Sequence, residues 1–178
     1  MRQHTVGILL FNEVEVLDFA GPFEVFSLPA STETNEKLFS VHTVSENGKL
    51  ISARNGLQVQ PDYSFDNHPA FDIVIVPGGY GAEEIEIYNE HVISWIQQQA
   101  TEVEIVASVC TGALLLAKAG LLDGITATTH WMDLDRLENE FPNVSVKRNV
   151  KFVDEGAIVT SGGISAGINM SFHLVAKL

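Results

Sequence analysis

The sequence is poor in cysteine and in positive charge. Its 178 residues include one cysteine, so no disulfide can form within the chain. One cysteine and six histidines scattered along the sequence also offer few candidate ligands for a zinc site. Ten Lys and Arg against 23 Asp and Glu give a net charge of −13, with no visible basic patch. That charge repels phosphate backbones and anionic lipids, so we expect neither nucleic acid nor a membrane as a partner.

Long hydrophobic runs are missing too. The apolar run 6–11 is too short for a signal peptide and no small-residue cleavage site follows it. No stretch approaches the roughly 20 residues that a membrane helix needs. Hydrophobic residues nevertheless make up 46% of the chain, which is enough to bury a core. We therefore expect a soluble, cytoplasmic protein with a single domain over residues 1–178.

Short apolar runs alternate with amphipathic segments, which predicts a parallel sheet covered by helices. Segment 50–60 alternates around Asn55-Gly56 and predicts a β-hairpin. The expected strands are 5–11, 39–44, 72–76, 103–109, 152–153 and 158–160, and the expected helices are 18–28, 90–99, 111–119, 131–141 and 166–178.

A nucleophile-capable residue, Cys110, stands where a buried strand runs directly into a helix. The junction has no loop, which forces a sharp turn with the thiol clear of the sheet edge, and Gly112 is small where helix and strand must pass closely. A helix N-terminus favours the thiolate, so this position predicts a lowered thiol pKa and a reactive sulfur. The alternative is an inert, buried core thiol.

Glycines follow the neighbouring strand, in the segment 77–81. They allow the backbone to point amides into the space beyond the strand ends, where open α/β sheets bind ligands. We expect the N–H groups of Gly79 and Thr111 to form an oxyanion-type donor pair. The alternative is an ordinary glycine-rich turn; a phosphate loop is excluded because no G-K-[ST] follows.

Two further side chains are candidates at the same edge. Asp18, at the start of the first helix, is either a helix N-cap or an acid that reaches Cys110. His130 follows Cys110 by 20 residues and is either catalytic or structural. A solvated face is expected for Glu83, Glu84 and Glu86, and a core or interface position for Trp95 and Trp131.

Several motifs occur together over essentially the whole chain. They are Leu17-Asp-Phe-Ala-Gly-Pro22, Val76-Pro-Gly-Gly79, Ser108-Val-Cys-Thr-Gly112, Ala119-Gly-Leu-Leu-Asp-Gly124, Thr128-Thr-His-Trp131 and Thr160-Ser-Gly-Gly-Ile-Ser-Ala-Gly-Ile168. With these motifs the chain resembles the DJ-one/ThiJ/PfpI superfamily. The last four motifs resemble one branch of it, the isocyanide hydratases and the sensor domains fused to AraC-type regulators.

The resemblance implies a class I glutamine-amidotransferase-like, flavodoxin-type fold: a doubly wound parallel sheet in an α/β/α sandwich, in a homodimer. It implies Cys110 as the nucleophile, Asp18 as the acid beside it, Thr111 as a neighbouring hydroxyl and amide, and Gly79 as an oxyanion-hole position. It implies no metal or organic cofactor. Members of the family usually continue well past Leu178.

The function that the resemblance implies is an isocyanide-hydratase-like lyase. Water would add to a small-molecule isocyanide through a thioimidate on Cys110, giving an N-substituted formamide. One alternative is a ligand- or redox-sensing domain without turnover, and a weaker one is an amidase or glyoxalase-type hydrolase. Thr111 replaces the histidine of the protease-like branch, so we expect no peptidase activity. Asn169 replaces an aspartate of the hydratase-like pattern, so support around the site is expected to differ.

Overall fold

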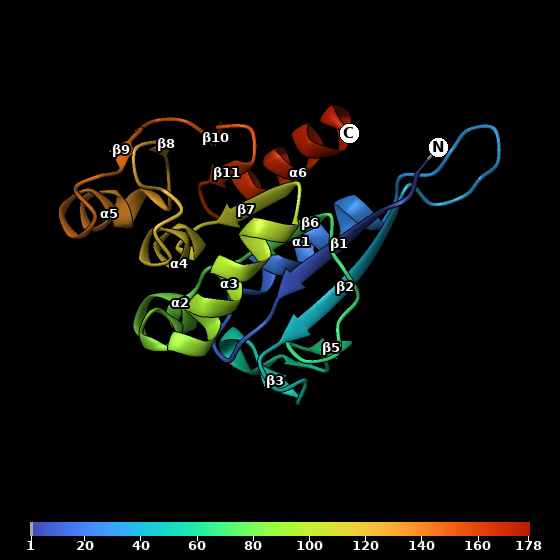
Figure 1. Cartoon of the computed structure of the whole chain (residues 1–178), viewed down its shortest axis with the longest axis horizontal. Helices are drawn as coiled ribbons and strands as arrows, with labels where there is room; N and C mark the ends of the chain where they lie inside the picture. The colour runs from blue at the N-terminus through green and yellow to red at the C-terminus, as the bar shows by residue number, and fades with distance from the viewer. Residues whose placement is uncertain (1) are drawn as a thin grey trace.

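The computed structural model describes residues 2–178, and a sheet of seven strands runs through its middle (Figure 1). The strand order is β10-β11-β7-β6-β1-β2-β5, and every neighbouring pair is parallel except β10 and β11. The strands are β1 (His4–Leu9), β2 (Phe39–Ser45), β5 (Tyr63–Ser64), β6 (Ile73–Val76), β7 (Ile105–Val109), β10 (Phe152–Asp154) and β11 (Ile158–Ser161).

Helices cover both faces of this sheet. The chain crosses from β1 to β2 in one direction and from β6 to β7 in the other, so right-handed crossovers put α1 and α3 on opposite faces. Helix α6 packs against α1, and α4 packs against α3 (Figure 1). The helices are α1 (Val16–Ser27), α2 (Tyr80–Glu84), α3 (Glu90–Glu102), α4 (Gly112–Lys118), α5 (Leu134–Glu140) and α6 (Ser165–Lys177).

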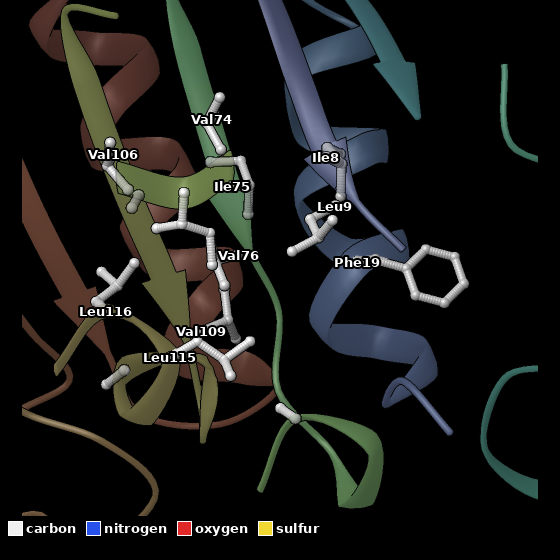
Figure 2. Packing of buried hydrophobic residues seen from close by; sticks show 14 of the residues in the cluster. Ile8, Leu9, Phe19, Val74, Ile75, Val76, Val106, Val109, Leu115 and Leu116 are labelled. Carbon is white, nitrogen blue, oxygen red and sulfur yellow. The ribbon is translucent and has the colours of Figure 1, made fainter. Parts of the chain in front are cut away.

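The core lies on the central strands. Every residue of β6 and of β7 is buried, as a strand with helices on both sides requires. Figure 2 shows side chains from β1, β6 and β7 packed with Phe19 of α1 and with Leu115 and Leu116 of α4. The packing fixes the carboxyl ends of these strands, where the candidate residues lie.

The doubly wound fold, the strand positions and the hairpin are confirmed. Strands β3 (Ile51–Ser52) and β4 (Gln58–Val59) pair antiparallel, and Asn55 between them has φ 63°. The sequence did not predict β5, helix α2 as a defined element, or the small parallel pair β8 (Thr126–Ala127) and β9 (Ser145–Val146). The helix expected over 131–141 is a 3₁₀ turn, η3 (Trp131–Asp133), followed by α5.

Trp131 is 74% exposed, so it is not a core residue, whereas Trp95 is buried as expected. Within residues 2–178 there is no helix with the length and hydrophobicity to cross a bilayer.

Candidate active site

The predicted site residues gather at the carboxyl edge of the sheet. Strands β1 and β6 are neighbours there but send their chains to helices on opposite faces, which is where open α/β sheets form a ligand crevice. A cavity of about 590 Å³ opens at this edge. Cys110, Thr111, Gly79 and His130 line it, and the fifth predicted residue, Asp18, has no exposed surface.

The turn at Cys110 is the sharp elbow that the sequence predicted. Cys110 has φ 55°, a left-handed conformation that costs a non-glycine residue about 1–3 kcal/mol. Its N–H donates to the carbonyl oxygens of Ser161 (3.2 Å) and Gly162 (3.1 Å), and its carbonyl accepts from the Thr129 hydroxyl (2.7 Å). These bonds hold the strained residue in place.

Gly112 allows helix α4 to start directly after this elbow. A Cβ at position 112 would lie 2.1 Å from the carbonyl oxygen of Val76 on the neighbouring strand. The expectation of a close helix–strand approach at Gly112 is therefore confirmed.

Asp18 connects three segments behind the sulfur. It is buried in the first turn of α1, while the N-cap position belongs to Glu15, so Asp18 is not the helix cap. Its Oδ2 accepts from the Gly78 N–H (3.3 Å) and its Oδ1 from the Ile164 N–H (3.1 Å). The Cys110 thiol lies close enough to lower the pKa of this carboxyl slightly, the smallest of the effects on it. Asp18 thus lies beside the thiol instead of capping the helix, and its role as an acid stays a prediction.

Burial and mutual repulsion set the protonation of this pair. Burial raises the pKa of Asp18 to about 6, although the N–H groups of Ile164 and Gly78 lower it. Burial and the negative charge of Asp18 raise the pKa of the Cys110 thiol, and they outweigh the N–H and hydroxyl of Thr111, which lower it. The predicted low thiol pKa is therefore wrong: the helix N-terminus is too weak against burial beside a carboxylate. At neutral pH the pair holds one proton, and it rests on the sulfur because Asp18 is the stronger acid of the two.

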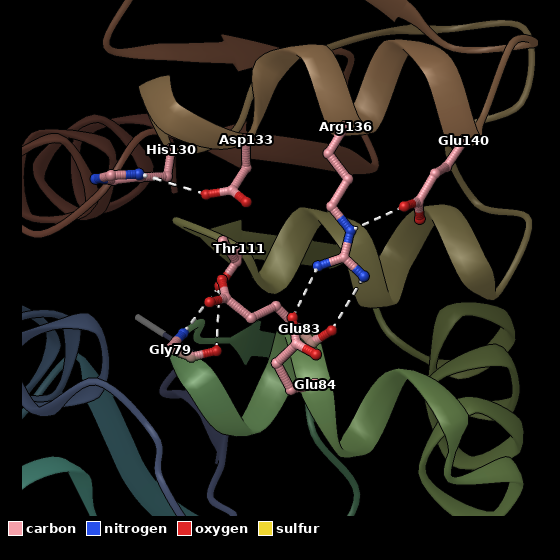
Figure 3. Close-up of polar contacts among 8 residues, drawn as sticks. All are labelled: Gly79, Glu83, Glu84, Thr111, His130, Asp133, Arg136 and Glu140. Atoms are coloured by element: carbon pink, nitrogen blue, oxygen red, sulfur yellow. Dashed lines mark hydrogen bonds and ion pairs between the residues drawn. The ribbon is translucent and has the colours of Figure 1, made fainter.

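Gly79 and Thr111 lie together, but they are bonded to each other (Figure 3). The Gly79 N–H donates to Thr111 Oγ1 (2.9 Å), so this amide is engaged, and the Thr111 N–H faces the sulfur of Cys110. Gly79 has φ 116°, and a Cβ there would lie 2.5 Å from the Glu15 nitrogen. The oxyanion pair stays a prediction that requires the Thr111 hydroxyl to release the Gly79 amide.

His130 lines the cavity without touching the thiol. Its Nδ1 accepts from the Met132 N–H (3.3 Å) and lies 3.5 Å from Asp133 Oδ2. A Cβ added to Gly163 would lie 3.0 Å from His130 Cδ2 and 3.5 Å from Cys110 Sγ, so the missing side chain of Gly163 leaves open space between ring and sulfur. Among residues 2–178 no hydrogen bond joins His130 to Cys110.

Sequence reasoning missed three contributors to the site. Glu83 was expected on a solvated face, yet it lines the cavity, and burial together with the charge of Asp133 raises its pKa. Asp133 and Ile164 also line the cavity, and Ile164 has φ 48° and ψ −99°. The position of Glu83 one helical turn after Gly79-Tyr80 could have indicated that it faces the site. The strained φ of Ile164 leaves no signal in the sequence. Glu86 is buried as well, which contradicts the same expectation.

Comparison with known proteins shows the family to which this chain belongs. A model of the DJ-1/PfpI family matches residues 4–177. The chain belongs to the DJ-1/PfpI family. It is 38% identical over 174 residues to an isonitrile hydratase of Pseudomonas putida, covering 97% of this chain and 71% of that protein.

Regulators of the same family are also similar. The chain is 35% identical to the HTH-type transcriptional regulator GbdR of Pseudomonas aeruginosa, over 97% of this chain but 46% of the regulator. The chain thus spans about half the length of that relative. A solved ThiJ/PfpI family protein from Pseudomonas syringae has the same fold, with a TM-score of 0.82 at 24% identity over 100% of this chain and 70% of that one.

Proposed function

We propose that this DJ-1/PfpI domain hydrates an isocyanide, R–N≡C, to an N-substituted formamide through a thioimidate on Cys110. The observation that carries the proposal is the Cys110–Asp18 pair, a thiol that lines a cavity beside a buried carboxyl of raised pKa. The identity to isonitrile hydratase supports it, because isonitrile is another name for isocyanide. A cavity of about 590 Å³ suits a small molecule.

The first half of the reaction uses the shared proton of the pair. The proton passes from the Cys110 thiol to Asp18, and the resulting thiolate attacks the terminal isocyanide carbon and forms a C–S bond. Asp18 gives its proton to the same carbon, which yields R–N=CH–S–Cys110 and leaves Asp18 ionised. At pH 7 a carboxyl with a pKa of about 6 is mostly ionised and the proton rests on the sulfur, so Asp18 has to take that proton from the thiol before it can pass it to the carbon.

The second half of the reaction hydrolyses the thioimidate and returns a proton to the Cys110–Asp18 pair. The Asp18 carboxylate orients a water molecule that attacks the thioimidate carbon. One water proton goes to the substrate nitrogen, the C–S bond breaks, and the other proton returns to the Cys110–Asp18 pair. The product is R–NH–CHO, and no oxidant, metal or organic cofactor enters the balance. A tetrahedral intermediate would accept a hydrogen bond from the Thr111 N–H. It would also accept one from the Gly79 N–H if the Thr111 hydroxyl releases that amide.

A second candidate function is ligand sensing without turnover. The similarity of 97% of this chain to GbdR, an HTH-type regulator, favours it. In that case the cavity binds a small molecule, or the sulfur is oxidised, and no product leaves. Amidase or glyoxalase-type hydrolysis remains the weaker alternative, and peptidase activity is not proposed because Thr111 supplies no adjacent base.

The experiment is a panel of aliphatic and aromatic isocyanides, with formamide measured by chromatography and the protein by electrospray mass spectrometry. We expect formamide from at least one isocyanide, and a protein adduct whose added mass equals that of the isocyanide. Cys110→Ser should abolish both signals. Saturable binding without formamide or adduct across the panel would reject hydration and favour sensing.

A further inference from the structure

We infer that the Cys110 cavity selects a substrate that carries a positive charge on the group remote from the reacting carbon. The identity of the reacting carbon rests on the proposed isocyanide hydration, whereas the preference for a cation rests on the cavity wall. Three carboxylates line the cavity, those of Glu15, Glu83 and Asp133, against a single guanidinium, that of Arg54.

The guanidinium of Arg54 does not neutralise this wall. It pairs with Glu13, a fourth carboxylate, at 3.9 Å, and it lies over the ring of Tyr80 at 5.6 Å from the centroid. Arg54 comes from the 3₁₀ turn η1 (Arg54–Gly56) of the hairpin, whereas Glu83 and Asp133 come from α2 and η3.

Arg136, the other cation near Glu83, already pairs with two other carboxylates. Arg136 donates to the backbone carbonyl of Glu83 and pairs with the carboxylates of Glu84 (3.7 Å) and Glu140 (3.1 Å) (Figure 3). The Glu83 side chain points toward Thr111, where the Asp133 carboxylate repels its charge. On the same wall, Nδ1 of His130 lies 3.5 Å from Oδ2 of Asp133. The carboxylates of Glu83 and Asp133 thus both line the cavity, and the Thr111 side chain and the charge of Arg136 offset the burial and repulsion of Glu83 only in part.

Aromatic rings complete a cation-binding wall. Tyr80 is 47% exposed and Trp131 is 74% exposed, and both line the same cavity. The face of an aromatic ring attracts cations, and because Arg54 already lies over Tyr80, Trp131 is the ring on which a substrate cation would pack. An uncharged substrate group would cover Glu83 and Asp133 without compensating their charge, whereas an organic cation would compensate it and pack on the rings.

The test uses isocyanides that differ in charge but not in shape. (2-Isocyanoethyl)trimethylammonium and 3,3-dimethylbutyl isocyanide are isosteric, one with N⁺ where the other has carbon, and 3-isocyanopropanoate supplies an anion. We expect kcat/KM for the cation to exceed that of the neutral isostere by about tenfold, the scale of a partly desolvated cation–π and ion-pair contact. The ratio should fall to within about threefold in Glu83→Gln/Asp133→Asn. It should be unchanged in Glu84→Gln, a neighbouring carboxylate that lies outside the cavity wall.

A second readout separates this inference from the proposed reaction. The corresponding formamides, cationic and neutral, are tested for protection of Cys110 against iodoacetamide. Better protection by the cation, even if no isocyanide is hydrated, supports the inference while the proposed function fails. Equal behaviour of the cationic and neutral compounds in both assays, or preference for the anion, overturns the inference.

Discussion

Replacing Asp18 by Asn removes the titrating half of the buried pair while keeping its shape. The pKa of Asp18 rises from its usual 3.8 to about 6 in the folded protein, mainly because of burial. Below about pH 3 the carboxyl is neutral in both the folded and the unfolded state, so it does not change the free energy of unfolding. Between pH 4 and 6 it ionises only on unfolding, so the free energy of unfolding falls as pH rises. Above pH 6 the ionised, buried carboxylate lowers the free energy of unfolding by about 3 kcal/mol relative to low pH, at 1.36 kcal/mol per pKa unit.

The Asn variant lacks this pH dependence. We therefore expect the difference in free energy of unfolding, variant minus wild type, to rise by about 3 kcal/mol between pH 3 and pH 7. The measurement is urea unfolding of both proteins at equal concentration across that range. Any hydrogen bond that Asn makes poorly to the Gly78 or Ile164 N–H shifts the difference equally at all pH values. A flat difference would refute the buried, raised-pKa carboxyl.

The same variant tests the chemistry. Asn cannot give a proton to the isocyanide carbon, so we expect turnover to fall by about 10²-fold or more, the usual scale of acid catalysis. A merely structural Asp18 would leave turnover unchanged in a variant that stays folded. The unfolding curves supply the control, because they show at each pH what fraction of the variant is folded.

Three further results are expected. Cys110 should alkylate more slowly at pH 7 than a free thiol of pKa about 8.5, and Asp18→Asn should shift its pH–rate profile to lower pH because a neighbouring negative charge is removed; identical profiles would contradict this. Purified protein should not cleave casein, and cleavage that disappears in Cys110→Ser would place the chain in the protease-like branch. Gly112→Ala should destabilise the fold by about 1–3 kcal/mol in urea unfolding, since its Cβ would meet the Val76 oxygen at 2.1 Å; an unchanged midpoint would argue against that contact.

The sheet and the elbow could be predicted because both depend on local pattern. Buried strands such as β6 and β7 are continuous apolar runs, and a nucleophile without a loop before its helix forces the turn at Cys110. The protonation of the site depends instead on burial by distant segments. Ile164 contacts Asp18 across 146 positions of sequence, and no local pattern shows that its N–H and the thiol meet one carboxyl.

The cavity wall was hidden for a similar reason. Glu83 belongs to a run of acidic residues that looks solvated in sequence, and only the fold brings Asp133 of η3 against it. Helix α2 turns Glu83 inward and leaves Glu84 exposed to Arg136, so adjacent residues of one type have different environments. The spacing of Glu83 from Gly79 could have suggested that Glu83 faces the cavity, but it could not have shown that Asp133 lies against it.

Catalysis and sensing make different demands on the Cys110–Asp18 pair. A sensor needs the cavity and an accessible sulfur, and it works with the shared proton on either atom. Hydration needs the proton on Asp18 when the sulfur attacks and needs that carboxyl to take a proton back at the end. Burial raises the pKa of both groups, so the pair holds one proton at neutral pH, and in the proposed reaction that proton passes from the sulfur to Asp18 and back. Ligand binding that survives in Asp18→Asn together with turnover that does not would therefore identify an enzyme, whereas a sensor would have no turnover to lose.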